Sequence, residues 1–244
     1  MARLVSTVII TSIVAAQLFG CHTKGVDKKV VEQALSGKAG ANIPQDRVRD
    51  AGEQAIPLIF DEVRDTPDEM IPYRASLLVD GMTAMHTADR SAPYIRKVLA
   101  DRQEPERIRV LAAEMLGFYW ESPEPQRALI EHAKHDTSEA VRVQCIVSLG
   151  GLTLSKLPRS NGCIVDQQVQ QVFAEAMKDK STKIREQTCD SVAVVGSEAL
   201  YEGVELAWCR QLLIQGKHDK EYVVRKAAVD GLFVLESIRQ KNRR

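Results

Sequence analysis

A recurring arginine motif is the feature that most limits how this 244-residue chain can fold. In each copy the arginine follows an aliphatic or aromatic residue and precedes apolar or small residues at helical spacing. The five arginines are Arg74, Arg109, Arg142, Arg185 and Arg225, so successive copies lie 35, 33, 43 and 40 residues apart. Repeats of about this length are typical of stacked helical hairpins, in which each unit needs its neighbours to bury its apolar side.

Apolar columns run through four of the copies on one side of the predicted helix. The residue before the arginine, the third after it and the seventh after it are four residues apart, so they share a narrow stripe at 3.6 residues per turn. The columns hold Ile108, Val141, Ile184 and Val224, then Ala112, Cys145, Thr188 and Ala228, then Leu116, Leu149, Val192 and Leu232. The pattern predicts that this helix buries one face in each copy.

An aspartate six residues before the arginine marks the predicted start of this helix in four copies. Its side chain can accept backbone N–H hydrogen bonds, and its charge favours the positive end of the helix dipole. The four are Asp68, Asp136, Asp179 and Asp219. A second amphipathic run lies upstream in every copy, beginning at residues 55, 92, 126, 169 and 206. The sequence therefore predicts an all-α fold, an α-solenoid of about five helical hairpins.

These residues resemble the HEAT family, in particular its short bacterial version. The resemblance rests on Pro57 and Pro93 in early first helices, on the recurring aspartate, on the Val-Arg or Ile-Arg pair that follows it, and on Leu-Gly pairs at 116–117 and 149–150. It covers about residues 51–240 and implies a binding scaffold, a function that many unrelated HEAT arrays share. It also implies a ladder of contacts between turns, made by Asp136, Arg142, Asp179, Arg185, Asp219 and Arg225.

The first 21 residues predict where in the cell the protein is located. Arg3 precedes an uncharged apolar run over 4–19, shorter than the roughly 20 residues of a membrane-spanning helix and typical of a signal peptide. The run ends in the tetrapeptide LFGC at 18–21, which resembles the lipobox of bacterial lipoproteins. The resemblance implies lipidation of Cys21 and attachment to the cell envelope by acyl chains, on the periplasmic side of the outer membrane in a Gram-negative source because residue 22 is not aspartate. An uncleaved anchor and an ordinary signal peptide are the alternatives.

The other segments are expected to connect or to end the array. Residues 22–48 are rich in charge and predict a tether with one loosely packed short helix, and the array itself spans 49–240. Pro158 and the turn former Asn161-Gly162 predict a surface loop inserted at 153–165. Residues 241–244 form a basic tail. Because 33 basic residues balance 33 acidic ones, the chain lacks the basic excess of a nucleic-acid binder, and no nucleic-acid partner is expected.

The four cysteines after Cys21 leave their pairing open. Cys145 and Cys189 occupy core columns and are expected to be buried as small apolar residues. Cys163 lies in the predicted loop, where a crosslink to Cys209 on the next first helix is the favoured disulfide. No spacing excludes the other pairings.

Catalytic and metal-binding motifs are scarce. His132 and His135 lie three residues apart beside acidic residues, which permits a weak metal-site hypothesis, but a position at the edge and last turn of a helix explains them as well. The sequence has no phosphate-binding glycine loop, G-x-S-x-G or H-E-x-x-H motif. We therefore expect that the protein has no cofactor and is not an enzyme. The alternative is a metal- or cofactor-assisted enzymatic activity.

The second helices of units two and three are more apolar than that of unit four, which indicates a partner surface or, alternatively, packing between repeats. The candidate residues are Val110, Leu111, Phe118, Tyr119, Trp120, Val143 and Val147. The predicted function is that of a lipid-anchored extracytoplasmic scaffold or adaptor for an unidentified protein or peptide. A purely structural envelope spacer is a further alternative.

Overall fold

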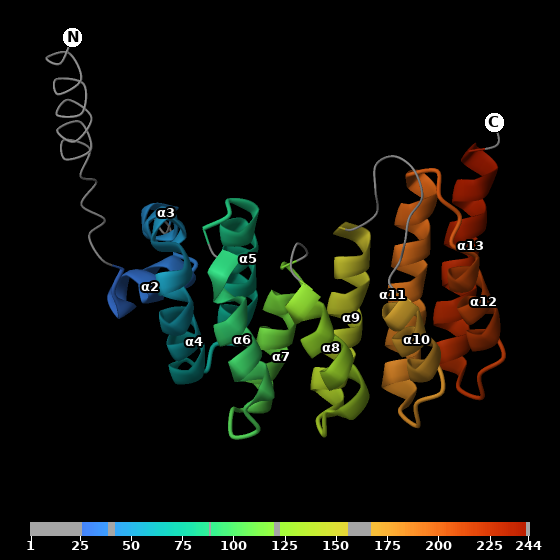
Figure 1. The fold of residues 1–244 in the computed structure, drawn as a ribbon, viewed down its shortest axis with the longest axis horizontal. Coiled ribbons are helices and arrows are strands. Elements are labelled where there is room, and N and C mark those ends of the chain that lie inside the picture. The colour runs from blue at the N-terminus through green and yellow to red at the C-terminus, as the bar shows by residue number, and fades with distance from the viewer. Residues whose placement is uncertain (1–25, 39–41, 88, 120–122, 156–166, 243–244) are drawn as a thin grey trace, which may run out of the picture.

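The computed structural model describes residues 26–38, 42–87, 89–119, 123–155 and 167–242, and regular structure in these ranges is entirely helical. Five helical hairpins stack side by side in this part of the chain (Figure 1). They pair α4 (Ile56–Asp65) with α5 (Met70–Ala84), α6 (Ala92–Ala100) with α7 (Glu106–Leu116), α8 (Pro123–His135) with α9 (Glu139–Ser155), α10 (Gln167–Ala176) with α11 (Thr182–Tyr201), and α12 (Ala207–Gly216) with α13 (Tyr222–Asn242). The prediction of an all-α solenoid is confirmed.

Local sequence sets where several helices begin. Pro57 and Pro93 occupy the first turn of α4 and α6, where the missing N–H of proline costs no hydrogen bond. Ser181 caps α11 by accepting a hydrogen bond from the Ile184 N–H. None of the helices in the described part of the chain is both long and apolar enough to span a bilayer.

The N-terminal end of the array is closed by α2 (Lys28–Leu35), α3 (Asn42–Ala51) and the short 3-10 helix η1 (Gly52–Ala55), with a second 3-10 turn, η2 (Asp89–Ser91), before α6. Asp27 caps α2 by accepting from the Val30 N–H at 2.9 Å. The predicted loose packing of this helix is wrong, because Val31 and Leu35 are fully buried and α2 packs on α3 and α4. The helix has eight residues, and the four apolar ones lie on one side, where they are buried and anchor it to the array.

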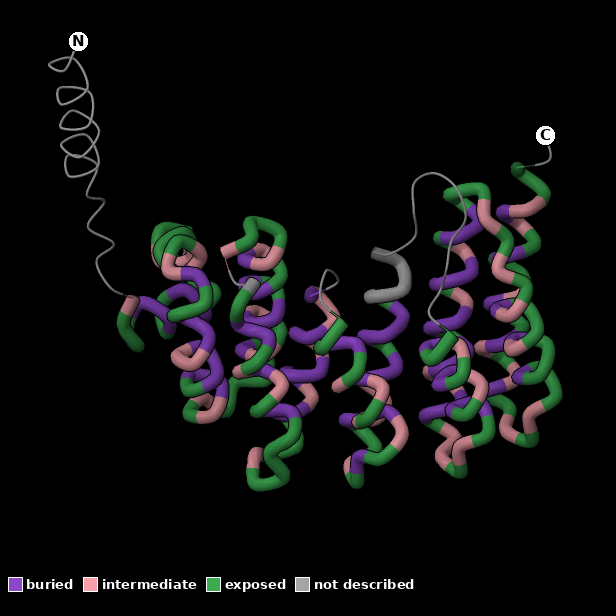
Figure 2. Tube along the Cα trace, viewed as in Figure 1, coloured by how far each residue is buried: buried purple, intermediate pink, exposed green. Residues whose placement is uncertain are grey.

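The core runs through the middle of every hairpin, as Figure 2 shows by the buried stretches on the inner side of each helix. The three apolar columns of the sequence lie in it. Every member is at most 1% exposed except Leu232 in the last unit, which is half-buried. The repeat pattern thus identifies the side of each second helix that faces the core.

Small residues let successive second helices approach closely. The eighth residue after the arginine in one unit meets the sixth in the next, in the pairs Gly117–Ser148, Gly150–Ser191 and Ala193–Gly231. A Cβ atom on Gly231 would lie 2.8 Å from the Ala193 Cβ, and one on Gly117 would lie 3.1 Å from the Ser148 Cβ. The contacts between second helices therefore depend on these small side chains.

Candidate partner-binding groove

The ladder aspartates close the turn within each hairpin. In units three, four and five the aspartate Oδ1 accepts from the backbone N–H two residues later, at 2.7–2.8 Å. The arginine of the same unit donates through Nη1 to the aspartate backbone carbonyl, at 2.9 Å from Arg142, 2.8 Å from Arg185 and 2.9 Å from Arg225. Each arginine thus fixes the turn that leads into its own helix.

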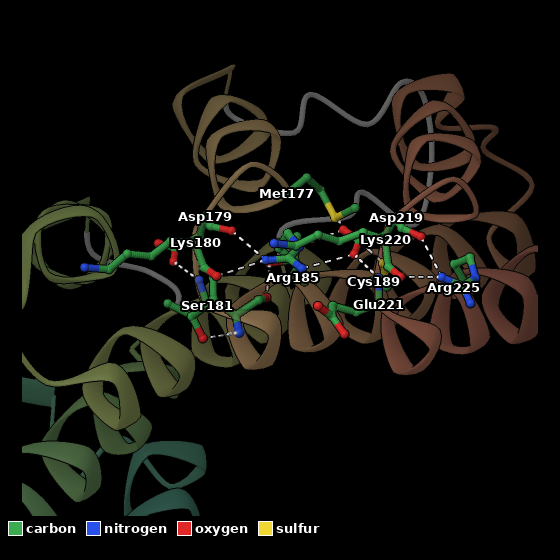
Figure 3. Close-up of polar contacts among 12 residues, drawn as sticks. Met177, Asp179, Lys180, Ser181, Arg185, Cys189, Asp219, Lys220, Glu221 and Arg225 are labelled. Carbon is green, nitrogen blue, oxygen red and sulfur yellow. Dashed lines mark hydrogen bonds and ion pairs between the residues drawn. The ribbon is translucent and has the colours of Figure 1, made fainter.

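The same arginines join neighbouring units at two junctions. Arg185 donates through Nε and Nη2 to the two carboxylate oxygens of Asp219, at 2.7 and 3.0 Å (Figure 3). Arg109 makes the equivalent ion pair with Asp136, and both side chains are almost completely buried. Among the described residues no ion pair joins Arg142 to Asp179, at the junction where the repeat spacing is longest. In the described part of the chain, ladder ion pairs therefore join units two and three and units four and five.

Hydrogen bonds keep the ladder carboxylates charged. Burial alone would raise the pKa of Asp136, but hydrogen bonds from His132 and the Ser138 N–H, together with the charge of Arg109, hold it below its ordinary value. The hydrogen bond from Arg185 lowers the pKa of Asp219 in the same way.

His132 belongs to this network, since its Nδ1 lies 2.9 Å from Asp136 Oδ2, whereas His135 is exposed at the end of α8. In the described ranges no group of three or more His, Cys, Asp or Glu side chains could hold a metal ion.

The second-helix groove is a cavity of about 420 Å³ between α5, α7 and α9, the second helices of the first three units. Its lining residues are Asp80, Thr83, Ala84, Glu114, Gly117, Phe118, Gln144, Val147, Ser148 and Gly151. Because α5, α7 and α9 follow one another along the array (Figure 1), the groove crosses three repeats. A hollow of this size accommodates a few side chains of a bound segment.

The groove combines carboxylates with an apolar patch. Asp80 is exposed, and Glu114 accepts a hydrogen bond from Ser76 Oγ at 2.7 Å, which holds its carboxylate at the groove wall. Phe118 is half-buried and Val147 is 38% exposed, so both present apolar surface to the cavity. The groove can therefore bind a side chain that has both a positive charge and a hydrocarbon part.

Only part of the predicted partner surface lines this groove. Phe118 and Val147 do, but Leu111 and Tyr119 are 1% and 6% exposed and belong to the core, so their assignment to a partner surface is wrong. Val110 and Val143 are half-buried and pack against the core. Trp120 lies outside the described residues.

The polar half of the groove was not identified from the sequence. Glu114 is the fifth residue after its arginine, and the same position holds Val147, Asp190 and Asp230 in the later units. Glu114 is half-buried and the other three are exposed, so this is the column that faces away from the core. Three of its four members are acidic, a pattern in the sequence that could have identified the polar half of the groove.

Negative charge continues along this face beyond the groove. Partial desolvation, followed by the nearby charge of Glu186, raises the pKa of Asp190 above its ordinary value. The local cations Lys183 and Lys226 form ion pairs with Glu186 and Asp230, respectively. Asp190 forms none of the ion pairs found in the described part of the chain, so the face has capacity for an external cation.

The cysteine predictions fall partly outside the described residues. Cys145 and Cys189 are fully buried, and burial raises the pKa of the Cys145 thiol and raises that of Cys189 to about 12. Cys209 is buried on α12. Cys21 and Cys163 lie outside the described ranges, so lipidation and the Cys163–Cys209 disulfide stay predictions.

Comparison with known proteins gives shape similarity only. No protein-family model and no curated protein matches the sequence. Human deoxyhypusine hydroxylase in complex with glycerol is 16% identical with a TM-score of 0.38, over 86% of this chain and 96% of that chain. An engineered protein is 14% identical with a TM-score of 0.47, over 86% and 98%, and a designed armadillo repeat protein in complex with the peptide (KR)4 is 14% identical with a TM-score of 0.42, over 85% and 98%. None of these similarities assigns an activity, ligand or partner to this chain.

Proposed function

We propose that this protein is a membrane-tethered scaffold that binds a basic segment of a partner protein in the second-helix groove. The observation that carries this proposal is the cavity itself, which lies across three repeats and places Asp80 and Glu114 beside Phe118 and Val147. A stack of hairpins provides a long, continuous surface on which side chains from several repeats can form such a groove.

The chemistry of the groove defines the partner segment. A lysine or arginine can place its charged group near Asp80 or Glu114 and its methylene groups against Phe118 and Val147, because these side chains combine a charge with an apolar stem. A second basic residue of the segment, further along the array, would meet Asp190 on the same face. An extended segment with spaced basic residues and few acidic ones fits this arrangement.

Photo-crosslinking in cells tests the groove. A photoreactive amino acid at Val147 is expected to yield a defined protein adduct, which mass spectrometry of the crosslinked peptide identifies as a basic segment. Replacing Asp80 and Glu114 together by Asn and Gln removes two charges with little change in shape. We expect this double variant to lower the adduct yield about tenfold, corresponding to about 1.4 kcal/mol of binding free energy.

The matched control is the same photoreactive residue at Ile214 on α12, which is 37% exposed, close to the 38% of Val147, but lies outside the groove. Equal adducts at both positions, or an adduct at Val147 whose yield ignores the two carboxylates, would contradict the proposed site.

The tether is proposed from Cys21, which supports attachment by acyl chains. Substitution Cys21→Ser removes the thiol that accepts the lipid, so we expect unprocessed precursor to accumulate and membrane-bound mature protein to disappear. Metabolic labelling with a fatty-acid analogue and electrophoretic mobility measure both effects, with Cys163→Ser as the matched control that should label as wild type. A Cys21→Ser variant that is still labelled, mature and membrane-bound would show that Cys21 is not the acceptor.

A further inference from the structure

The last second helix, α13, exposes positions that neighbours cover in the inner units. The fourth residue after the arginine is fully buried in units two, three and four, as Ala113, Ile146 and Cys189, but Val229 in unit five is 46% exposed. The end units of repeat arrays need a polar outer side to stay soluble. Here the outer side of the final helix exposes large apolar side chains.

Phe233 makes this end unlike an inner junction. The eighth residue after the arginine is Gly117, Gly150 or Ala193 in the preceding units, where it accepts the next helix. Phe233 is 73% exposed at this position, and Tyr222, on the same side of α13, is 67% exposed. A further repeat of the same kind could not pack as closely against a phenylalanine, so the occupant of this face must have a different geometry.

Arg225 adds a positive charge to the same face, where its guanidinium lies over the Tyr222 ring, 6.0 Å from the ring centroid. Its Nη1 donates to the carbonyls of Asp219 and Lys220 (Figure 3), as Arg185 does to Asp179 and Lys180. Arg185 also binds the carboxylate of the next unit, but no carboxylate in the described part of the chain forms an ion pair with Arg225. An acidic side chain of a partner on this face would therefore supply the ion pair that the inner units have.

We propose that α13 pairs antiparallel with α13 of a second copy of this chain, forming a two-fold symmetric dimer. At about 100° per residue, Tyr222, Arg225, Val229, Phe233 and Glu236 fall within one arc of about 80°. A two-fold axis near residue 231 places Arg225 opposite Glu236 of the second copy and Val229 opposite its Phe233. One axis thus satisfies the charge and buries the apolar side chains, which is the self-complementarity that a symmetric interface requires.

The composition of both ends favours this pairing over head-to-tail stacking. All apolar residues of α2 at the opposite end of the array are buried, and α3 exposes a single large apolar side chain, Ile43, so this end offers no apolar stripe to a second copy's α13. Glu236 is half-exposed, and its contact with Arg239 is long, at 3.6 Å, so it can turn toward a partner cation.

Sedimentation and light scattering of the full chain in detergent micelles test the dimer. The wild type is expected to show a concentration-dependent dimer mass. Phe233→Asp should raise the dimer dissociation constant at least tenfold, whereas the matched variant Val234→Asp, next to it but off the face, should leave the dissociation constant within about threefold of wild type. Circular dichroism checks that both variants keep their helix content.

A charge exchange separates a contact between copies from a local fold effect. Arg225→Glu and Glu236→Arg should each weaken the dimer about tenfold, and the double variant should restore it because the charges meet again across the axis. A monomeric wild type, or a dimer that Phe233→Asp leaves intact, would overturn the proposal. Failure of the double variant to recover while it remains folded would exclude the antiparallel arrangement.

Discussion

Replacing Asp136 with alanine is expected to lower the free energy of unfolding by about 3–5 kcal/mol. The substitution leaves the Arg109 guanidinium buried between units two and three, where the Leu99 carbonyl at 3.1 Å is its remaining hydrogen-bond acceptor among the described residues. Removing one member of a buried ion pair costs this much because the other charge stays desolvated without a partner. The variant also loses the cap on the Ser138 N–H. Urea unfolding of the chain lacking residues 1–21 measures the difference.

The matched control is Asp65→Ala, which removes an ion pair between α4 and Lys28 whose two side chains are more than half exposed. We expect it to cost much less than Asp136→Ala, because exposed pairs are solvated and screened. Equal losses for Asp65→Ala and Asp136→Ala would show that the ladder contributes nothing beyond an ordinary surface pair.

Acid pH provides a second readout of the same variant. Because the folded state holds the pKa of Asp136 below 3.8, the stabilisation is fully present above about pH 4 and is lost as the pH falls through the lowered pKa. The stability difference between wild type and Asp136→Ala should therefore shrink on acidification. A difference that stays constant from neutral pH to about pH 2 would place the effect elsewhere than in the carboxylate charge.

The repeat pattern predicts the fold because periodicity and burial have the same physical cause. Ile108, Val141, Ile184 and Val224 are apolar because each faces the core of its own hairpin, so 3.6-residue spacing is enough to find them. The first unit departs from the pattern. There Arg74 donates to the carbonyls of Leu35 and Ser36 in the N-terminal segment. Because this segment is not part of the repeat, the repeat pattern does not predict the position of Arg74.

The candidate site depends on distances between units, which periodicity does not encode. Leu111 and Val147 are both apolar residues of second helices, yet the first is buried by neighbouring units and the second lines the groove. Asp80 reaches the groove from the irregular first unit, whose alignment with the others fails. The same limit applies to the ladder: the repeat pattern implies its contacts, but among the described residues no ion pair joins Arg142 to Asp179.

Leu149→Ala is expected to cost about 2–5 kcal/mol, the range for a buried leucine that leaves a cavity. Leu149 is fully buried in the third of five units, so neighbours on both sides restrict how far the cavity can collapse. Leu232 occupies the same column in the last unit but is half-buried, with a unit on one side of it. Leu232→Ala should therefore cost less than Leu149→Ala and loosen chiefly the final hairpin.

Hydrogen exchange distinguishes the two variants beyond their total stability. Stacked repeats are held mainly by nearest-neighbour contacts, so a loss in the middle should uncouple the units before Leu149 from those after it, and a loss at the end should raise exchange in α12 and α13 alone. Chemical denaturation at a concentration below any self-association supplies the free energies. Equal losses of stability for the two variants, with uniform exchange along the chain, would identify one fully cooperative domain. The two ends of the solenoid would then not unfold independently of each other.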